Sequence, residues 1–265
     1  MRTGGQLIVD TLEANGVDRL YSVPGESYLA VLDALHDSRI ENVVCRQEGG
    51  AAMMADCHGR LTGRPGICFV TRGPGATNAS AGVHIARQDS VPMILFIGQV
   101  ARRIKEREAF QEVDYKAFYG SIAKWVVEID DAARIPELVT RAFAVATSGR
   151  PGPVVVSLPE DMLTDEVEAP APLPFTPVEA RPGAHEMEAM LALLDKAERP
   201  FVILGGTRWT QDAVRRMCRS LERWSLPAGC SFRRQALCDQ LHANYAGDIG
   251  IGANPKLASY IKDSD

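Results

Sequence analysis

The sequence predicts an α/β fold: a parallel sheet flanked by helices, followed by an incomplete second α/β domain. Strand-like and helix-like segments alternate along residues 4–160. Two of the strand-like segments, 67–70 and 93–97, are apolar without interruption, which is typical of strands buried on both faces of a parallel sheet. A proline-rich stretch at 159–184 then separates this unit from a second α/β pattern.

The first unit opens with a predicted helix over residues 4–15, which ends at Gly16. A strand at 19–23 follows and runs into the turn Pro24-Gly25-Glu26-Ser27, where Ser27 is expected to cap the next helix. The order of strand, turn and helix then recurs. The further predicted elements are strand 42–45 with helix 49–62, strand 67–71 with helix 75–88, strands 93–97 and 123–128, helix 131–147 and strand 153–157.

The second unit begins after residues 161–184, which we expect to form an extended linker because prolines punctuate them. Helix 185–196, strand 201–204, helix 210–224 and a short strand near 226–229 are predicted there. These are too few strands to close a sheet. Residues 185–265 are therefore expected to be the first part of a domain that continues in a longer chain.

Composition excludes several classes of function. A content of 46% hydrophobic and 24% charged residues describes a soluble globular protein, and we expect it to be cytoplasmic. The net charge of −5 and the lack of a basic cluster argue against nucleic acid or a membrane surface as a partner. The six cysteines form no CxxC pair, which favours reduced structural thiols over a metal site.

Glu48 is the first candidate for chemistry. It lies between a predicted strand and a predicted helix, and the small residues Gly49, Gly50, Ala51 and Ala52 would let a flat ring approach its carboxylate. Ligands of parallel sheets bind at the carboxyl ends of the strands, which is where Glu48 falls. On spacing alone the plainer alternative is favoured, a solvated acid stabilised by the positive end of a helix.

Two further segments are candidates for a functional role. The turn Thr71-Arg72-Gly73-Pro74-Gly75-Ala76-Thr77-Asn78 permits close approach to a ligand through its glycines, and it is equally compatible with a simple tight turn. Residues 101–114 form a long, highly charged loop. Loops of this length are often functional or mobile in compact domains. The alternative is that the charged side chains of this loop simply face solvent.

Taken in order, these segments resemble the amino-terminal part of thiamine-diphosphate-dependent enzymes, closest to the acetolactate synthase large-subunit group. The matching pieces are Val23-Pro24-Gly25, Arg46-Gln47-Glu48-Gly49-Gly50-Ala51-Ala52, Gly73-Pro74-Gly75-Ala76-Thr77-Asn78, Asp89-Ser90-Val91-Pro92, Gly98-Gln99-Val100, Ala109-Phe110-Gln111-Glu112 and Gly149-Arg150-Pro151-Gly152-Pro153-Val154. Each piece is weak evidence by itself, whereas the ordered set is specific.

The resemblance implies a domain plan. Residues 1–160 would be the pyrimidine-binding domain, 161–184 the linker and 185–265 the first part of the central domain. The family's third domain, whose Gly-Asp-Gly…Asn motif holds the diphosphate through Mg²⁺, has no equivalent in this sequence. The resemblance also implies a homo-oligomer, dimer or tetramer, with each active site between two subunits, and it leaves FAD binding open.

The resemblance also assigns roles to residues. Glu48 would hydrogen-bond N1′ of the aminopyrimidine and so promote loss of the thiazolium C2 proton. The implied cofactor-binding residues are Gly25, Glu48, Pro74 and Asn78, the implied substrate residues are Phe110 and Gln111, and the candidate catalytic residues are Glu48, Glu26 and Gln111.

Two residues depart from the family pattern. Glu26 stands where acetolactate synthases typically have glycine, and it is either a proton donor that favours simple decarboxylation or a cap for the next helix. Arg72 replaces a common serine. It could bind a substrate carboxylate, contact a neighbouring subunit or face water.

The function we expect is that of a thiamine-diphosphate-dependent 2-oxo acid decarboxylase or carboligase, a transferase or lyase with pyruvate as default substrate. The chain alone is expected to be inactive because the diphosphate-binding part is missing from it. The alternatives are a simple 2-oxo acid decarboxylase and a non-catalytic, partner-binding or regulatory short chain. A plain nucleotide-binding fold is excluded because no glycine fingerprint follows the first strand.

Overall fold

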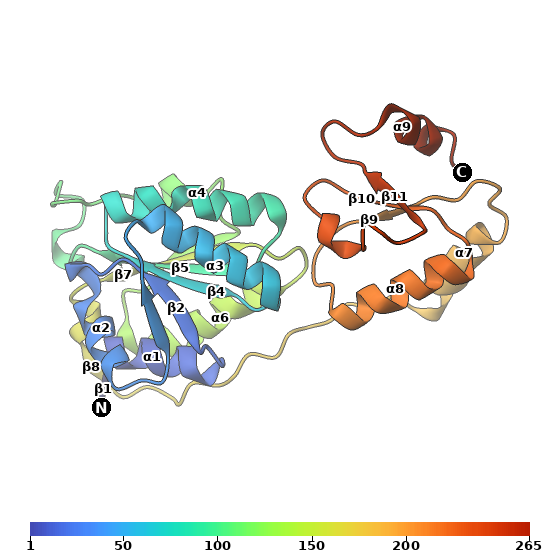
Figure 1. The fold of residues 1–265 in the computed structure, drawn as a ribbon. Coiled ribbons are helices and arrows are strands. Elements are labelled where there is room, and N and C mark those ends of the chain that lie inside the picture. Colours follow the sequence, from blue (N-terminus) through green and yellow to red (C-terminus); the bar gives the residue numbers. More distant parts are fainter. The chain divides into compact units, whose positions relative to one another are not determined.

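The computed structural model describes residues 1–265, which form two compact units, Met1–Val178 and Glu179–Asp265. Each unit has a parallel sheet of its own (Figure 1). The predicted α/β class is confirmed. Because the placement of one unit relative to the other is undetermined, each is described by itself.

A six-stranded parallel sheet forms the centre of the first unit. Its strands lie in the order β3-β2-β4-β5-β7-β6. Their bounds are Arg19–Ser22 (β2), Glu41–Val44 (β3), Gly66–Val70 (β4), Met93–Gln99 (β5), Trp125–Glu128 (β6) and Pro153–Pro159 (β7). The predicted apolar strands β4 and β5 are completely buried, as expected for the middle of a sheet covered on both faces.

Helices cover both faces of this sheet (Figure 1). One face carries α1 (Gly4–Ala14), α2 (Leu29–His36) and α6 (Ile135–Thr147), and the other carries α3 (Glu48–Thr62), α4 (Pro74–Asp89) and α5 (Tyr115–Tyr119). Alternate residues of β5 enter the two cores, with Ile94 and Phe96 in the first and Leu95 and Ile97 in the second. Short 3₁₀ helices cover Glu26–Tyr28 (η1), Arg102–Ile104 (η2), Ala132–Arg134 (η3) and Met162–Thr164 (η4).

Several helix ends follow local capping rules. Thr3 and Gln6 form a capping box at α1, Gln47 caps α3 by accepting from Gly50 N, and Gly63 ends α3 in the left-handed conformation. The predicted cap at Ser27 is wrong, because α2 begins without a side-chain cap. The Ser27 hydroxyl is instead 2.8 Å from Thr71 Oγ1, since η1 lies against the neighbouring turn.

The first part of the segment that we expected to be a linker is attached to the first unit. Strand β8 (Glu166–Val167) pairs antiparallel with β1 (Arg2–Thr3), and Phe175 N donates to Asn15 Oδ1 at 2.9 Å. Apolar side chains explain the attachment, because Val167, Ala169 and Phe175 pack against the core beneath α1 and α6.

The second unit is smaller. Its parallel sheet has the order β11-β10-β9. The elements are α7 (Ala184–Leu194), β9 (Val202–Leu204), α8 (Gln211–Arg223), β10 (Ala228–Cys230), η5 (Gln235–Leu237), β11 (Tyr245–Asp248) and α9 (Pro255–Lys262). A short core of Leu204, Leu221, Ala228 and Cys230 lies between the sheet and α8. None of the helices in either unit combines the length and the apolar content that crossing a membrane requires.

Candidate active site at the carboxyl edge of the first sheet

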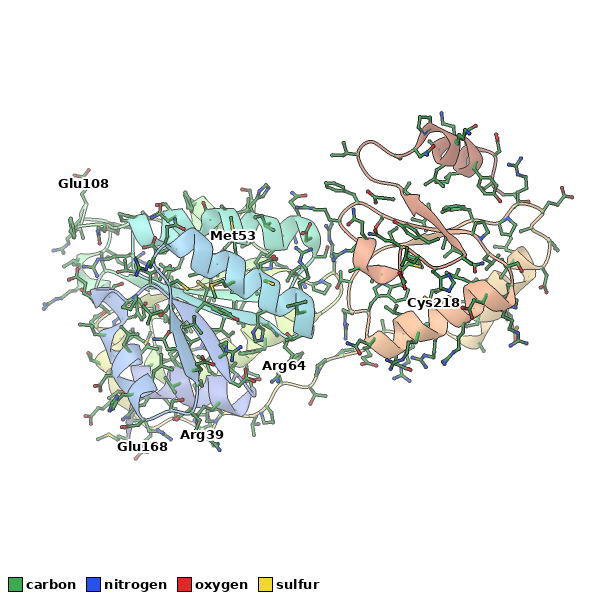
Figure 2. The ribbon with its side chains drawn as sticks, viewed as in Figure 1. Arg39, Met53, Arg64, Glu108, Glu168 and Cys218 are labelled. Carbon is green, nitrogen blue, oxygen red and sulfur yellow. The ribbon has the colours of Figure 1, made fainter.

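All six strands of the first sheet run in one direction, so their carboxyl ends meet at one edge. We call this the carboxyl edge and the opposite one the amino edge. Glu108, beyond β5, and Arg64, just before β4, lie at opposite ends of the first unit (Figure 2). The predicted site residues all lie in the connections that leave the carboxyl edge, namely Gly25 and Glu26 after β2, Glu48 after β3, Pro74 and Asn78 after β4, and Phe110 and Gln111 after β5.

Glu48 is the first residue of α3 and is half-buried. Its Oε2 accepts a 3.0 Å hydrogen bond from Asn78 Nδ2, so α4 holds the carboxylate in place. Its Oε1 lies on the side of Gly75, where a Cβ atom would be 3.6 Å away. One carboxylate oxygen is thus fixed by an amide, and the other lies beside a residue that has no side chain. This arrangement replaces the fully solvated acid that spacing alone favoured.

Gly73 makes the turn between β4 and α4 possible. Its φ of 60° and ψ of −113° belong to a region that is essentially closed to other residues. A Cβ atom here would lie 2.7 Å from Gln111 Cβ and 2.9 Å from Gln111 O. The loop after β5 therefore packs directly against this glycine. The Tyr115 hydroxyl accepts from Gly73 N at 2.9 Å. Burial raises the pKa of Tyr115 to about 12, which keeps it neutral.

Arg72 is buried, which rules out the alternative that it faces water. Its Nη2 donates to Glu26 Oε1 at 2.7 Å and its Nη1 to Glu160 Oε2 at 3.0 Å. Its Nε donates to Phe110 O at 3.3 Å. The guanidinium therefore connects the segments that follow β2, β4, β5 and β7. Glu26 receives this bond and makes no side-chain cap, because η1 has none.

The predicted residues form one contiguous surface. A Cβ on Gly25 would overlap Thr71, a Cβ on Gly75 would lie 2.9 Å from Thr71 Cγ2, and Gly75 adjoins Glu48. Pro74, the first residue of α4, and Asn78, one turn later, are exposed. Phe110 is 75% exposed and projects into solvent beside this surface, while Gln111 is partly buried.

Sequence reasoning missed two residues here, Glu160 and Tyr115. Glu160 directly follows β7, so its place after a strand of the parallel sheet was a signal that could have found it. Nothing in the sequence pattern connects Tyr115 with Gly73.

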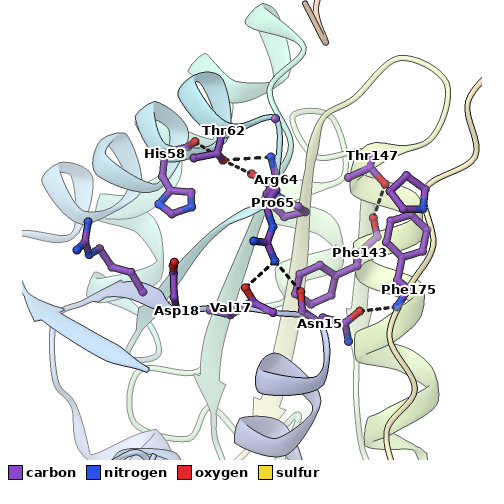
Figure 3. A pocket seen from close by; sticks show the side chains of 14 residues that line it. Asn15, Val17, Asp18, His58, Thr62, Arg64, Pro65, Phe143, Thr147 and Phe175 are labelled. Carbon is purple, nitrogen blue, oxygen red and sulfur yellow. Dashed lines mark hydrogen bonds between the residues drawn. The ribbon is translucent and has the colours of Figure 1, made fainter. Parts of the chain in front are cut away.

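A cavity of about 250 Å³ opens at the amino edge (Figure 3). His58 lies on one side of it, Asn15, Phe143 and Phe175 lie on the other, and Arg64 lies between them. Arg64 Nη2 donates to the carbonyl oxygens of Asn15 and Gly16, at 3.1 and 2.5 Å. None of the predicted site residues lines this cavity.

Comparison with known families identifies both units. Residues 2–118 match the family described as "Thiamine pyrophosphate enzyme, N-terminal TPP binding domain". Residues 187–265 match "Thiamine pyrophosphate enzyme, central domain". The chain carries these two domains of the thiamine pyrophosphate enzymes. The carboxyl edge described above lies within the domain that is named for binding this cofactor.

Individual relatives are similar over nearly the whole chain. The acetolactate synthase isozyme 2 large subunit of Escherichia coli is 35% identical, covering 99% of this chain and 48% of the relative. The acetolactate synthase of Bacillus subtilis is 33% identical, covering 99% and 46%. The probable acetolactate synthase large subunit of Methanocaldococcus jannaschii is 33% identical, covering 97% and 44%. The chain spans about half the length of the curated relatives that it matches.

The residues at the carboxyl edge fit the aminopyrimidine half of thiamine diphosphate. A flat, nitrogen-rich ring needs a carboxylate, polar amides and an uncluttered approach. Glu48 supplies the carboxylate and Asn78 an amide, and Gly75 leaves open the space that a side chain would fill beside Glu48 Oε1. The diphosphate half needs a metal and its ligands, and the structure contains no cluster of three or more metal-binding side chains.

Proposed function

We propose that this chain is the amino-terminal part of a thiamine-diphosphate-dependent carboligase of acetolactate synthase type, with 2-oxo acids such as pyruvate as substrates. The observation that carries the proposal is the carboxylate of Glu48, fixed by Asn78 through one oxygen and left beside Gly75 on the other, inside the matched cofactor-binding domain.

In this proposal the bound cofactor supplies the nucleophilic carbon and the electron sink for decarboxylation. Glu48 would bind the ring nitrogen N1′ and hold the proton that is exchanged there, while the Asn78 amide keeps the carboxylate from rotating. The turn at Gly73 and Gly75 lets the ring approach closely. Phe110 and Gln111 contact the substrate from the loop after β5. Gly25 would border the reacting carbon, and Pro74 would lie against the pyrimidine ring.

The domain plan belongs to the same proposal. Residues 1–160 bind the pyrimidine, residues 161–184 connect, and residues 185–265 are the first part of the central domain. We propose that Mg²⁺ is bound by a diphosphate domain outside these residues and that the active site forms between subunits of a homo-oligomer. The isolated chain should therefore bind thiamine diphosphate weakly. Tight binding of the cofactor by residues 1–265 alone, measured by calorimetry with Mg²⁺, would contradict this plan.

The test is Glu48→Gln in the native protein that contains this chain. Gln keeps the size and one acceptor but cannot exchange a proton at this position. Exchange of the C2 proton of bound thiamine diphosphate, followed by NMR in deuterated buffer, should slow by about 10²- to 10⁴-fold.

Glu41→Gln provides the matched control, because Glu41 is an exposed acid at the other end of the strand that leads to Glu48. It should leave the exchange rate within a factor of about two. An unchanged rate in Glu48→Gln with cofactor still bound would remove Glu48 from the mechanism.

A further inference from the structure

We propose that Arg72 is a positioning residue: together with Glu26 and Glu160 it fixes the loop over residues 104–112, which presents Phe110 and Gln111 to the substrate. This inference rests on the proposed function, which assigns those two residues to substrate binding. It reassigns Glu26 from a proton donor to a partner of Arg72.

The backbone of the loop is strained, so contacts with its surroundings must maintain its conformation. The loop contains no glycine, yet three of its residues have positive φ angles: 60° at Glu106, 54° at Glu108 and 64° at Gln111. Side chains disfavour this left-handed region, so a free loop would relax out of it. Strain of this kind persists only where the surroundings impose the conformation.

Apolar packing does not impose it. A cavity of about 300 Å³ lies beside the loop, bordered by Lys105, Glu106 and Glu112 from the loop and by Gln99, Glu128 and Ser157 from the sheet. At its tip Phe110 is 75% exposed. Hydrogen bonds and ion pairs must therefore hold the loop in place.

Charged groups supply those bonds. The carboxylate of Glu112 accepts from Glu106 N at 2.6 Å and from Ala109 N at 3.2 Å, so it closes the loop on itself. Lys105 pairs with Glu128 on β6. Arg72 contacts the tip directly, because its Nε donates to the carbonyl oxygen of Phe110.

Arg72 suits this task because it is itself held rigidly. Its side chain is only 9% exposed, and carboxylates of Glu26 and Glu160 accept from two different nitrogens of the fork. A lysine has one nitrogen and no fixed fork, so it cannot reproduce three bonds in one plane. With the guanidinium engaged on both sides, Arg72 is not available to bind a substrate carboxylate.

The test compares two readouts in the native protein. Arg72→Met should lower kcat/KM for pyruvate by about 100-fold, because a displacement of about 1 Å in a substrate-positioning group has an effect of that size. It should leave C2 proton exchange on bound thiamine diphosphate within about twofold of wild type, because Glu48 is undisturbed. Arg72→Lys should fall between wild type and Arg72→Met. General loss of structure would depress both readouts together.

Arg60→Met is the matched control. Arg60 also pairs with two carboxylates, Asp56 and Asp89, but it lies in the last turn of α3, at the end remote from Glu48. It should leave both readouts close to wild type. If Arg72→Met does not fold, Glu160→Gln removes the charge of one partner and should lower kcat/KM by about tenfold, a milder form of the same displacement.

The outcomes separate the two proposals. Absence of C2 proton exchange in the wild-type protein would overturn the proposed function. Normal exchange in wild type with unchanged kcat/KM in Arg72→Met and Glu160→Gln would overturn the positioning role alone. Faster hydrogen exchange at the amides of residues 106–112 in Arg72→Met, with exchange elsewhere unchanged, is the expected structural signature.

Discussion

Arg72 at the carboxyl edge of the first sheet and Arg64 at the amino edge are held in opposite ways. At the carboxyl edge Arg72 is buried between two carboxylates and a carbonyl, and Glu48 is fixed by Asn78. At the amino edge Arg64 is exposed, and its guanidinium donates to main-chain carbonyls just after α1. A cavity lies at each edge, of about 300 and about 250 Å³.

The two cavities are similar in volume, so volume alone does not distinguish the edges. At the carboxyl edge the side chains and backbone are held in fixed conformations. Arg72 is paired with two carboxylates, Gly73 has a conformation closed to other residues, and the loop after β5 has residues at positive φ. Around the amino-edge cavity the constraint is weaker, because the Arg64 guanidinium bonds to main-chain carbonyls alone and nothing lies within 4 Å of a Cβ atom placed on Gly63. Residues that must be held still for catalysis are expected at the first kind of edge.

The largest difference between the two edges is expected when one glycine from each edge is replaced by alanine. Gly73→Ala places a Cβ atom 2.7 Å from Gln111 in a backbone region closed to alanine, and should lower the free energy of unfolding by about 3 kcal/mol. Gly63→Ala at the amino edge also has positive φ, but nothing lies within 4 Å of its Cβ, so the loss should be about 1 kcal/mol. Urea unfolding measures both. Equal losses would show that the carboxyl edge is no more constrained.

A weaker effect is expected from Arg64→Met. It removes two hydrogen bonds to carbonyl oxygens that water can replace, so the free energy of unfolding should fall by about 1 kcal/mol. Its kcat/KM should equal that of wild type. A large loss of activity in a variant that remains folded would assign the amino edge a functional role.

The smallest effect concerns pH. Burial lowers the pKa of His58, beside the amino-edge cavity, below its usual 6.5. The unfolded chain therefore binds the proton more readily, and stability falls as the pH decreases below about 6.5. His58→Gln should lose less stability than wild type between about pH 7 and about pH 5, measured by thermal unfolding in buffers of constant ionic strength. The same pH dependence in both proteins would contradict a half-buried imidazole with a lowered pKa.

Local and periodic features were predictable from the sequence. The buried strands follow from uninterrupted apolar runs, and Glu48 at the start of α3 follows from its place between a β-branched run and small helix-forming residues. The end of α3 at Gly63 follows from the conformational freedom of glycine. The convergence of the site residues follows from the parallel direction of the strands.

Contacts between distant side chains were not predictable. Arg72 finds Glu26 and Glu160, which are 46 and 88 residues away, and no local pattern indicates either pairing. Ser27 has the residue type of a helix cap, yet its hydroxyl bonds to Thr71 because η1 packs against the next turn. The pairing of β1 with β8 involves two residues on each side, too few to show periodicity.

Hydrogen exchange of the native protein with and without thiamine diphosphate and Mg²⁺ tests the central claim most directly, because it locates the cofactor without requiring turnover. We predict slower exchange at the amides of residues 25–27, 48–50, 73–78 and 109–112, with residues 15–19 and 62–65 unchanged. Protection confined to residues 15–19 and 62–65 would place the ligand at the amino edge and contradict the account.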